Sequence, residues 1–76
     1  MPTGTVSVPD TLLGARLRDL RTERGYSQVT LALLLNTQAN RVSNWETGHV
    51  VPKLELLQRI AAVYNITVSE LLADVM

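Results

Sequence analysis

The segment NTQANRVSNWETG, residues 36–48, carries polar side chains at spacings suited to binding a flat ligand edge. At about 100° per residue, Asn40, Ser43 and Asn44 share one side of a helix. The methyl group of Ala39 lies on the same side. An asparagine amide can donate to N7 of adenine and accept from its N6 amino group at the same time. The chemistry of this face is that of base-edge contacts in a DNA major groove.

Two basic residues flank this face. Arg41 lies at its edge, where a DNA phosphate would pass, and Lys53 stands at the entry to a later helix. Either could instead be a solvated surface charge, and the asparagines and Ser43 could belong to an ordinary exposed polar face. The residue types alone leave these alternatives open.

Catalytic and metal-binding chemistry has little support in the sequence. The chain has no cysteine and a single histidine, His49. It contains neither a glycine-rich phosphate loop nor a nucleophile elbow, and no pair of carboxylates suggests an acid-base site. We therefore expect no enzyme activity, no bound metal and no cofactor.

The elements that must position these residues are helices. Apolar residues recur at helical spacing, and no segment alternates with period two for long enough to predict a strand. Gly25, Asn36, Gly48 and Asn65 belong to the types that most readily take the left-handed conformation at a helix end. We expect an all-α fold with helices over residues 10–24, 28–35, 38–47, 53–64 and 68–75.

Residues that are typical of helix starts occur where these predicted helices begin. Asp10 and Ser27 precede the first two helices as candidate N-caps, and Thr67 with Glu70 makes a capping box for the last. Pro52 suits the entry to the fourth helix, because the first helical turn does not need its missing N–H.

The core should form where the apolar sides of these helices meet. Val42 and Trp45 point away from Asn40 and Asn44, so they should anchor the 38–47 helix from beneath. The expected core residues are Leu17, Leu20, Leu31, Ala32, Leu35, Val42, Trp45, Leu54, Leu57, Ile60 and Ala61.

The second and third helices are joined by about three residues around Asn36 and Thr37. So short a turn makes neighbouring helices cross steeply, which is the helix-turn-helix geometry.

The composition fits one small domain. The chain has 76 residues, 46% of them hydrophobic, and zero formal net charge. We expect a flexible arm over residues 1–9 and a folded domain over residues 10–76. The absence of cysteine and of any long apolar run predicts a cytoplasmic protein without a membrane partner. Zero net charge weighs against a nucleic-acid partner, although basic residues exceed acidic ones before residue 54.

Two stretches, LGARLRDLRTERGYSQVTLALLLNTQANRVSNWETG and PKLELLQRIAAVYNITVSELL, resemble the lambda-repressor-like helix-turn-helix domain of the Xre, or Cro/CI, type. The resemblance covers about residues 12–72. It implies a compact five-helix bundle and a bacterial or phage DNA-binding regulator that acts as a dimer. The features in register are Arg21, Gly25, Ser27, Gln28, Leu31, Ala32, Trp45, Glu46, Gly48, Pro52 and Leu54.

The resemblance also implies residue roles. Gln28 and Arg41 match positions that contact DNA phosphates, and Lys53 is a further candidate from its place in the sequence. Arg21 and Glu46 match an ion pair that ties the first helix to the end of the third. The family's base-reading positions are held here by Ala39, Asn40, Ser43 and Asn44.

The chain departs from the family pattern at several positions. Asn36 replaces the usual turn glycine, and Gln38 replaces a Ser or Thr cap, which weakens the cap by about 1 kcal/mol at most. Ala39 cannot form a hydrogen bond where a polar reader is frequent. Leu33 and Leu34 occupy positions that are usually charged.

We expect a sequence-specific regulator of transcription, a repressor, that places its 38–47 helix in the major groove of double-stranded DNA. It would act as a homodimer on a palindromic operator and associate with the nucleoid when bound. The alternative is an antitoxin or adaptor that uses the same fold mainly to hold a toxin or other protein partner. Leu33, Leu34 and the zero net charge favour this alternative. A restriction-modification controller is a narrower form of the regulator, and an activator is also compatible with the sequence. The sequence does not decide among these roles.

Overall fold

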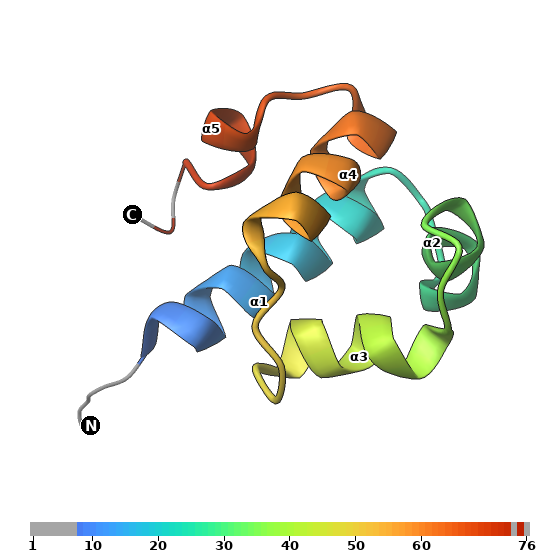
Figure 1. Ribbon diagram of the computed structural model, residues 1–76, viewed down its shortest axis with the longest axis horizontal. Helices are drawn as coiled ribbons and strands as arrows, with labels where there is room; N and C mark the ends of the chain where they lie inside the picture. The colour runs from blue at the N-terminus through green and yellow to red at the C-terminus, as the bar shows by residue number, and fades with distance from the viewer. Residues whose placement is uncertain (1–7, 74, 76) are drawn as a thin grey trace.

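The computed structural model describes residues 8–73 and residue 75, and over these residues it contains five α-helices and no strand. The helices are α1 (Val8–Glu23), α2 (Gln28–Leu34), α3 (Ala39–Thr47), α4 (Leu54–Tyr64) and α5 (Val68–Leu71). In Figure 1, α3 lies along one edge of the molecule and α5 on the opposite side. The expected all-α, five-helix architecture is confirmed. Most of the expected arm falls on residues 1–7, which lie outside the described residues.

The predicted helix ends are confirmed by the backbone angles. Asn36 and Asn65 both have φ of 58°, and Gly25 and Gly48 have φ of 76° and 84°. All four adopt the left-handed conformation, which ends a helix and turns the chain toward the next one. Asparagine thus performs at position 36 the role that the family usually gives to glycine.

Helix starts follow the predictions in part. The Ser27 hydroxyl accepts from the backbone N–H of Thr30 at 3.0 Å, and Thr67 and Glu70 form the complete capping box. Asp10 was wrongly expected as an N-cap, because α1 begins two residues earlier, at Val8, and Asp10 lies in its first turn. Gln38, at the N-cap of α3, makes no side-chain capping bond.

The described core contains nearly all the predicted residues. Leu54 is the error, because its side chain is 60% exposed. It begins α4 and lies at the edge of that helix's apolar side, so it extends past the neighbouring helices. Three further core residues were not predicted: Leu13, Tyr64 and Leu71. None of the described helices combines the length and apolarity required to cross a bilayer.

Gly14 sets the contact between α1 and α3. A Cβ at this position would lie 2.8 Å from the carbonyl oxygen of Trp45 and closer still to that of Glu46. Real Cβ atoms do not approach so near, so any larger residue would push α3 away from α1. The glycine therefore fixes where the C-terminal end of α3 lies.

Three arginines stabilise helix C-termini. Arg16 donates to two carbonyl oxygens of α5 at 2.8 and 2.9 Å, and Arg24 to the last carbonyl of α4 at 3.5 Å. Arg59 donates to the carbonyl oxygen of Leu35, which caps α2. Positive charge at these ends complements the helix dipole and satisfies carbonyls that lack an intrahelical donor.

Candidate nucleic-acid interface

The third helix turns a polar side away from the protein body. Val42 is 1% exposed and Trp45 is also buried, so these two side chains hold α3 against the core. Asn40 is exposed on the opposite side, while Ser43 and Asn44 are half-buried at its margins. This arrangement is what the helical spacing predicts.

The side chains on this face are available for a ligand. Among the described residues, no hydrogen bond engages the side-chain amides of Asn40 and Asn44. The backbone carbonyl of Asn44 accepts instead from the N–H of Val50 at 3.1 Å, which ties the following loop to α3. The Thr47 hydroxyl donates to the carbonyl of Ser43 at 2.9 Å. The backbone carbonyls of Ser43 and Asn44 thus accept from nearby donors, and the side-chain amides of Asn40 and Asn44 are not used for this. Ala39, also half-buried, presents only a methyl group.

The turn that holds α3 against α2 is tight. The backbone N–H of Thr37 donates to the carbonyl of Ala32 at 2.8 Å, and Asn36 supplies the left-handed residue between the helices. Figure 1 shows α2 and α3 meeting steeply at one end of the molecule. This is the helix-turn-helix geometry that the short connection predicts.

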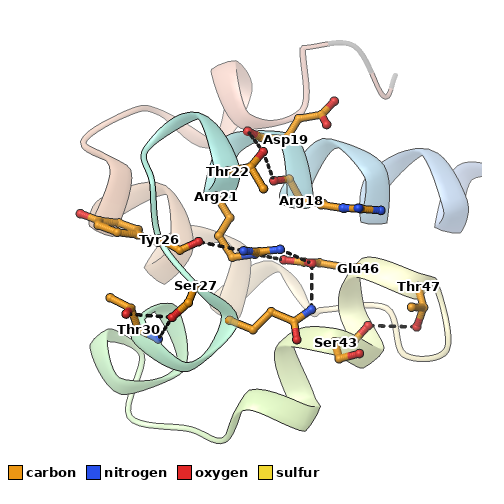
Figure 2. Close-up of polar contacts among 11 residues, drawn as sticks. Arg18, Asp19, Arg21, Thr22, Tyr26, Ser27, Thr30, Ser43, Glu46 and Thr47 are labelled. Atoms are coloured by element: carbon orange, nitrogen blue, oxygen red, sulfur yellow. Dashed lines mark hydrogen bonds and ion pairs between the residues drawn. The ribbon is translucent and has the colours of Figure 1, made fainter.

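The ion pair between Arg21 and Glu46 is present and nearly buried. Nε and Nη2 of Arg21 donate to the two carboxylate oxygens at 2.6 and 3.1 Å, a bidentate geometry (Figure 2). The two side chains are 11% and 4% exposed. The hydrogen bond that Arg21 donates to the Glu46 carboxylate raises the pKa of Arg21 further above its already high ordinary value. Arg21 also donates to the carbonyl of Tyr26 at 2.8 Å, so it joins α1 to the entry of α2.

The structure adds Gln28 to this network. Its Nε2 donates to Oε1 of Glu46 at 3.2 Å. A single carboxylate at the end of α3 therefore accepts from α1 and from the first residue of α2. One amide hydrogen and the amide oxygen of Gln28 remain for another partner. Sequence reasoning identified Gln28 and Glu46 separately but missed their bond, because spacing along the chain does not show which side chains meet across helices.

Arg41 and Lys53 lie on the other flank of α3. Both are exposed, and both line a hollow of about 240 Å³ beside the α3–α4 loop, together with Trp45. The fold thus brings two of the predicted phosphate contacts to one side of the polar face and places Gln28 on the other.

Apolar residues are exposed in two groups beside this site. Val29, Leu33 and Leu34 project from α2, and Leu33 is 74% exposed. Val50 and Val51 are half-exposed in the α3–α4 loop. The unusual leucines of α2 are therefore surface residues, as their positions predict.

Comparison with known proteins identifies the family. The helix-turn-helix family model HTH_3 matches residues 17–71. The cryptic phage CTXphi transcriptional repressor RstR of Vibrio cholerae is 32% identical over 63 residues, which is 83% of this chain and 57% of that protein. The HTH-type transcriptional regulator DdrOP3 of Deinococcus deserti is 42% identical over 60 residues, 79% of this chain and 46% of that protein. The chain thus spans about half the length of these curated relatives.

A solved structure agrees with the sequence matches. The restriction-modification controller protein C.AhdI of Aeromonas hydrophila superimposes with a TM-score of 0.75 and is 36% identical. The match covers 80% of this chain and 92% of that one. The helix-turn-helix geometry, the Arg21–Glu46 pair and these similarities together show that the chain belongs to the lambda-repressor-like, Xre or Cro/CI-type, helix-turn-helix family.

Proposed function

We propose that this protein is a sequence-specific regulator of transcription, a repressor, that inserts α3 into the major groove of double-stranded DNA. The observation that carries the proposal is the outward polar face of α3, with exposed Asn40 above buried Val42. A helix fits the major groove, and its side-chain amides match the edge of adenine. The names of relatives, which include a phage repressor, support the same role.

In this proposal, the residues of α3 divide by chemistry. Asn40 and Asn44 form hydrogen bonds to base edges, Ser43 contributes a hydroxyl, and Ala39 packs against a thymine methyl group. These contacts would select sequence, whereas contacts to phosphates would set orientation.

Phosphate contacts would come from both flanks of α3. Gln28 supplies its remaining neutral amide hydrogen on one side, and Arg41 and Lys53 supply charge on the other. The two strands of a duplex border the major groove on opposite sides, so this division matches one phosphate backbone to each flank.

A homodimer would give the affinity that one module lacks. One α3 reads only a few base pairs, and the charge available on one protomer is small. Two protomers related by a two-fold axis would place two α3 helices in successive major grooves about 34 Å apart. The operator would then be palindromic, and the protein would be cytoplasmic and nucleoid-associated when bound.

The test is selection from a random duplex library by the purified protein at fixed salt concentration, followed by sequencing. We expect an enriched palindrome whose half-sites are separated by about one helical turn. The variant Asn40→Ala with Asn44→Ala serves as the control, because it keeps the fold and removes both amides. An unenriched library from the unmodified protein, or the same palindrome from both proteins, would contradict the proposal.

A second candidate function has its own observation. Leu33 and Leu34 on α2 lie together on the surface, which suits an antitoxin or adaptor that holds a protein partner through this helix. Purification from the native host would distinguish the two: a stoichiometric complex that Leu33→Glu disrupts favours the adaptor, and a protein recovered alone does not.

A further inference from the structure

A groove between α3 and α4 contains two arginines from different helices. Its volume is about 510 Å³, and it extends from the α2–α3 turn along the inner flank of α3. Arg41 enters it from α3 and Arg59 from α4, while Trp45 and Leu56 form its apolar wall. Binding sites for small molecules are usually about 300–1,000 Å³, so the groove is large enough to hold one.

The charge in this groove is not neutralised by the protein. None of its lining residues is acidic, and in the described part of the chain the one ion pair is that of Arg21 with Glu46. A guanidinium group has five N–H donors. Arg59 uses one of them on the carbonyl oxygen of Leu35, a bond that orients its side chain at the groove. The remaining donors of both arginines have no acceptor among the described residues.

The groove also continues into a partly apolar surface. The smaller hollow of about 240 Å³ shares Arg41, Trp45 and Leu56 with it. Its other lining residues are three apolar ones and two charged ones of opposite sign: Val50, Val51, Pro52, Lys53 and Glu55. A ligand whose charged group lies between Arg41 and Arg59 would therefore have the apolar side chains of Trp45 and Leu56 beside it, with Val50 and Val51 in the adjoining hollow. An inorganic ion would use only the two arginines.

We propose that this groove binds a small organic carboxylate attached to an apolar ring. Arg41 and Arg59 hold the carboxylate, for which the planar guanidinium fork is the best-matched side chain. Trp45 and Leu56 contact the ring. The site is distinct from the proposed base contacts, because none of Ala39, Asn40, Ser43 and Asn44 lines the groove.

Trp45 allows a direct test, since it is the only tryptophan of the chain. Phenylacetate is added at constant ionic strength, and the emission of Trp45 and the NMR signal of its indole N–H are followed. We expect saturable binding with a dissociation constant on the order of 1 mM, the strength typical of so small a ligand. The matched neutral probe, phenylacetamide, should bind at least about tenfold more weakly, and inorganic phosphate should not saturate either signal.

Substitutions test whether the ligand binds at the two arginines of the groove. Arg41→Ala should weaken phenylacetate binding at least about tenfold, and Arg59→Lys should weaken it while keeping the charge, because the fork is lost. Arg18→Ala removes an exposed arginine that does not line the groove, and it should leave binding unchanged. Circular dichroism checks that each variant is folded. No saturable signal, equal binding of phenylacetamide or of phosphate, or equal binding by Arg41→Ala would overturn the proposal.

A consequence for regulation follows if the proposed function also holds. Arg41 would serve both the carboxylate and a DNA phosphate, so each ligand would lower the affinity for the other by the same factor. The fluorescence test contains no DNA, and its failure is therefore distinguishable from a failure of DNA binding.

Discussion

At the scale of single residues, Glu46 does the most to hold the site in place. Its carboxylate accepts from Arg21 on α1 and from Gln28 on α2, while the residue itself belongs to α3. Three helices are thereby fixed to one another by one nearly buried side chain. The polar face of α3 can be presented at a constant angle because its C-terminal end is held this way.

Removing this carboxylate should be costly. Glu46→Ala leaves the nearly buried guanidinium of Arg21 without its partner, and we expect the free energy of unfolding to fall by about 3–5 kcal/mol. Urea unfolding followed by circular dichroism measures the change. Glu55→Ala removes an exposed acid on α4 and should cost less than about 0.5 kcal/mol. Similar values for both variants would show that the pair contributes no more than a surface charge.

Tyr64 predicts a pH effect. Its hydroxyl is buried without a hydrogen-bond partner among the described residues, and burial raises the pKa of Tyr64 to about 12. The unfolded chain releases this proton near pH 10. Because the pKa of Tyr64 is higher in the folded state, the free energy of unfolding keeps its full value below pH 10. It falls as the pH rises from 10 toward 12.

Tyr64→Phe should therefore be at least as stable as the unmodified protein at neutral pH, because no buried hydroxyl is left unpaired. Between about pH 10 and pH 12 the free energy of unfolding should fall by up to about 2–3 kcal/mol more in the unmodified protein than in the variant. Urea unfolding at both pH values gives the comparison. Equal losses in the two proteins would mean that the hydroxyl titrates normally in the folded state.

At the scale of elements, α5 shows how a very short helix can be held. It has four residues, capped at its start by Thr67 and Glu70 and at its end by Arg16. Its Leu71 is 0% exposed. Isolated helices of this length do not form in water, so packing of this side chain must contribute most of its stability.

A matched pair of leucine variants tests this interpretation. Leu71→Ala should lower the free energy of unfolding by about 2–5 kcal/mol, since it leaves a cavity in the core. Leu54→Ala should cost less than about 0.5 kcal/mol, because that side chain is largely exposed. Both values come from urea unfolding. A larger cost at Leu54 would show that its exposed side chain is covered by a second protomer or another partner.

The elements also show what the sequence could predict. Helix ends were predictable because Asn36 and Asn65 act through their own conformational preference, and the Thr67 cap acts within one turn. The early start of α1 was not predictable in the same way, since Asp10 is compatible with both the cap and the first turn. Leu54 was misassigned because helical spacing shows which side a residue faces but not how far the neighbouring helices extend.

The missed parts of the site have the same physical origin. Gln28 meets Glu46, and Arg59 meets the end of α2, only after the helices have packed. Gly14 lies in a regular helical pattern, and its close approach to α3 depends on the crossing of two helices. Contacts between residues distant in sequence leave no local signal, whereas the polar face of α3 is visible because it is periodic.

At the scale of the whole molecule, most of the basic side chains donate hydrogen bonds to other groups of the protein. The chain has seven lysines and arginines, and Arg16, Arg21, Arg24 and Arg59 donate to groups of the protein itself. The remaining basic residues, which have no intramolecular acceptor in the described part of the chain, are Arg18, Arg41 and Lys53.

This small number predicts a weak dependence of DNA affinity on salt. Each phosphate contact by a basic residue contributes about 0.9 to the slope of log affinity against log salt, so three per protomer limit a dimer to about 5. Binding of the selected operator is measured across a salt series by fluorescence anisotropy. Arg41→Ala should reduce the slope by about 2 for the dimer. A slope near 10 would show that arginines which donate to groups of the protein itself also contact DNA.

The most direct test is whether Asn40 recognises a base. The unmodified protein and Asn40→Ala are each titrated with the selected operator and with duplexes that carry one changed base pair at each position of the half-site. We predict one position at which changing the base pair costs the unmodified protein about 1–3 kcal/mol of binding free energy. At that position the same change should cost the variant none. Equal losses by the two proteins at every position would contradict the assignment of α3 as the helix that reads DNA.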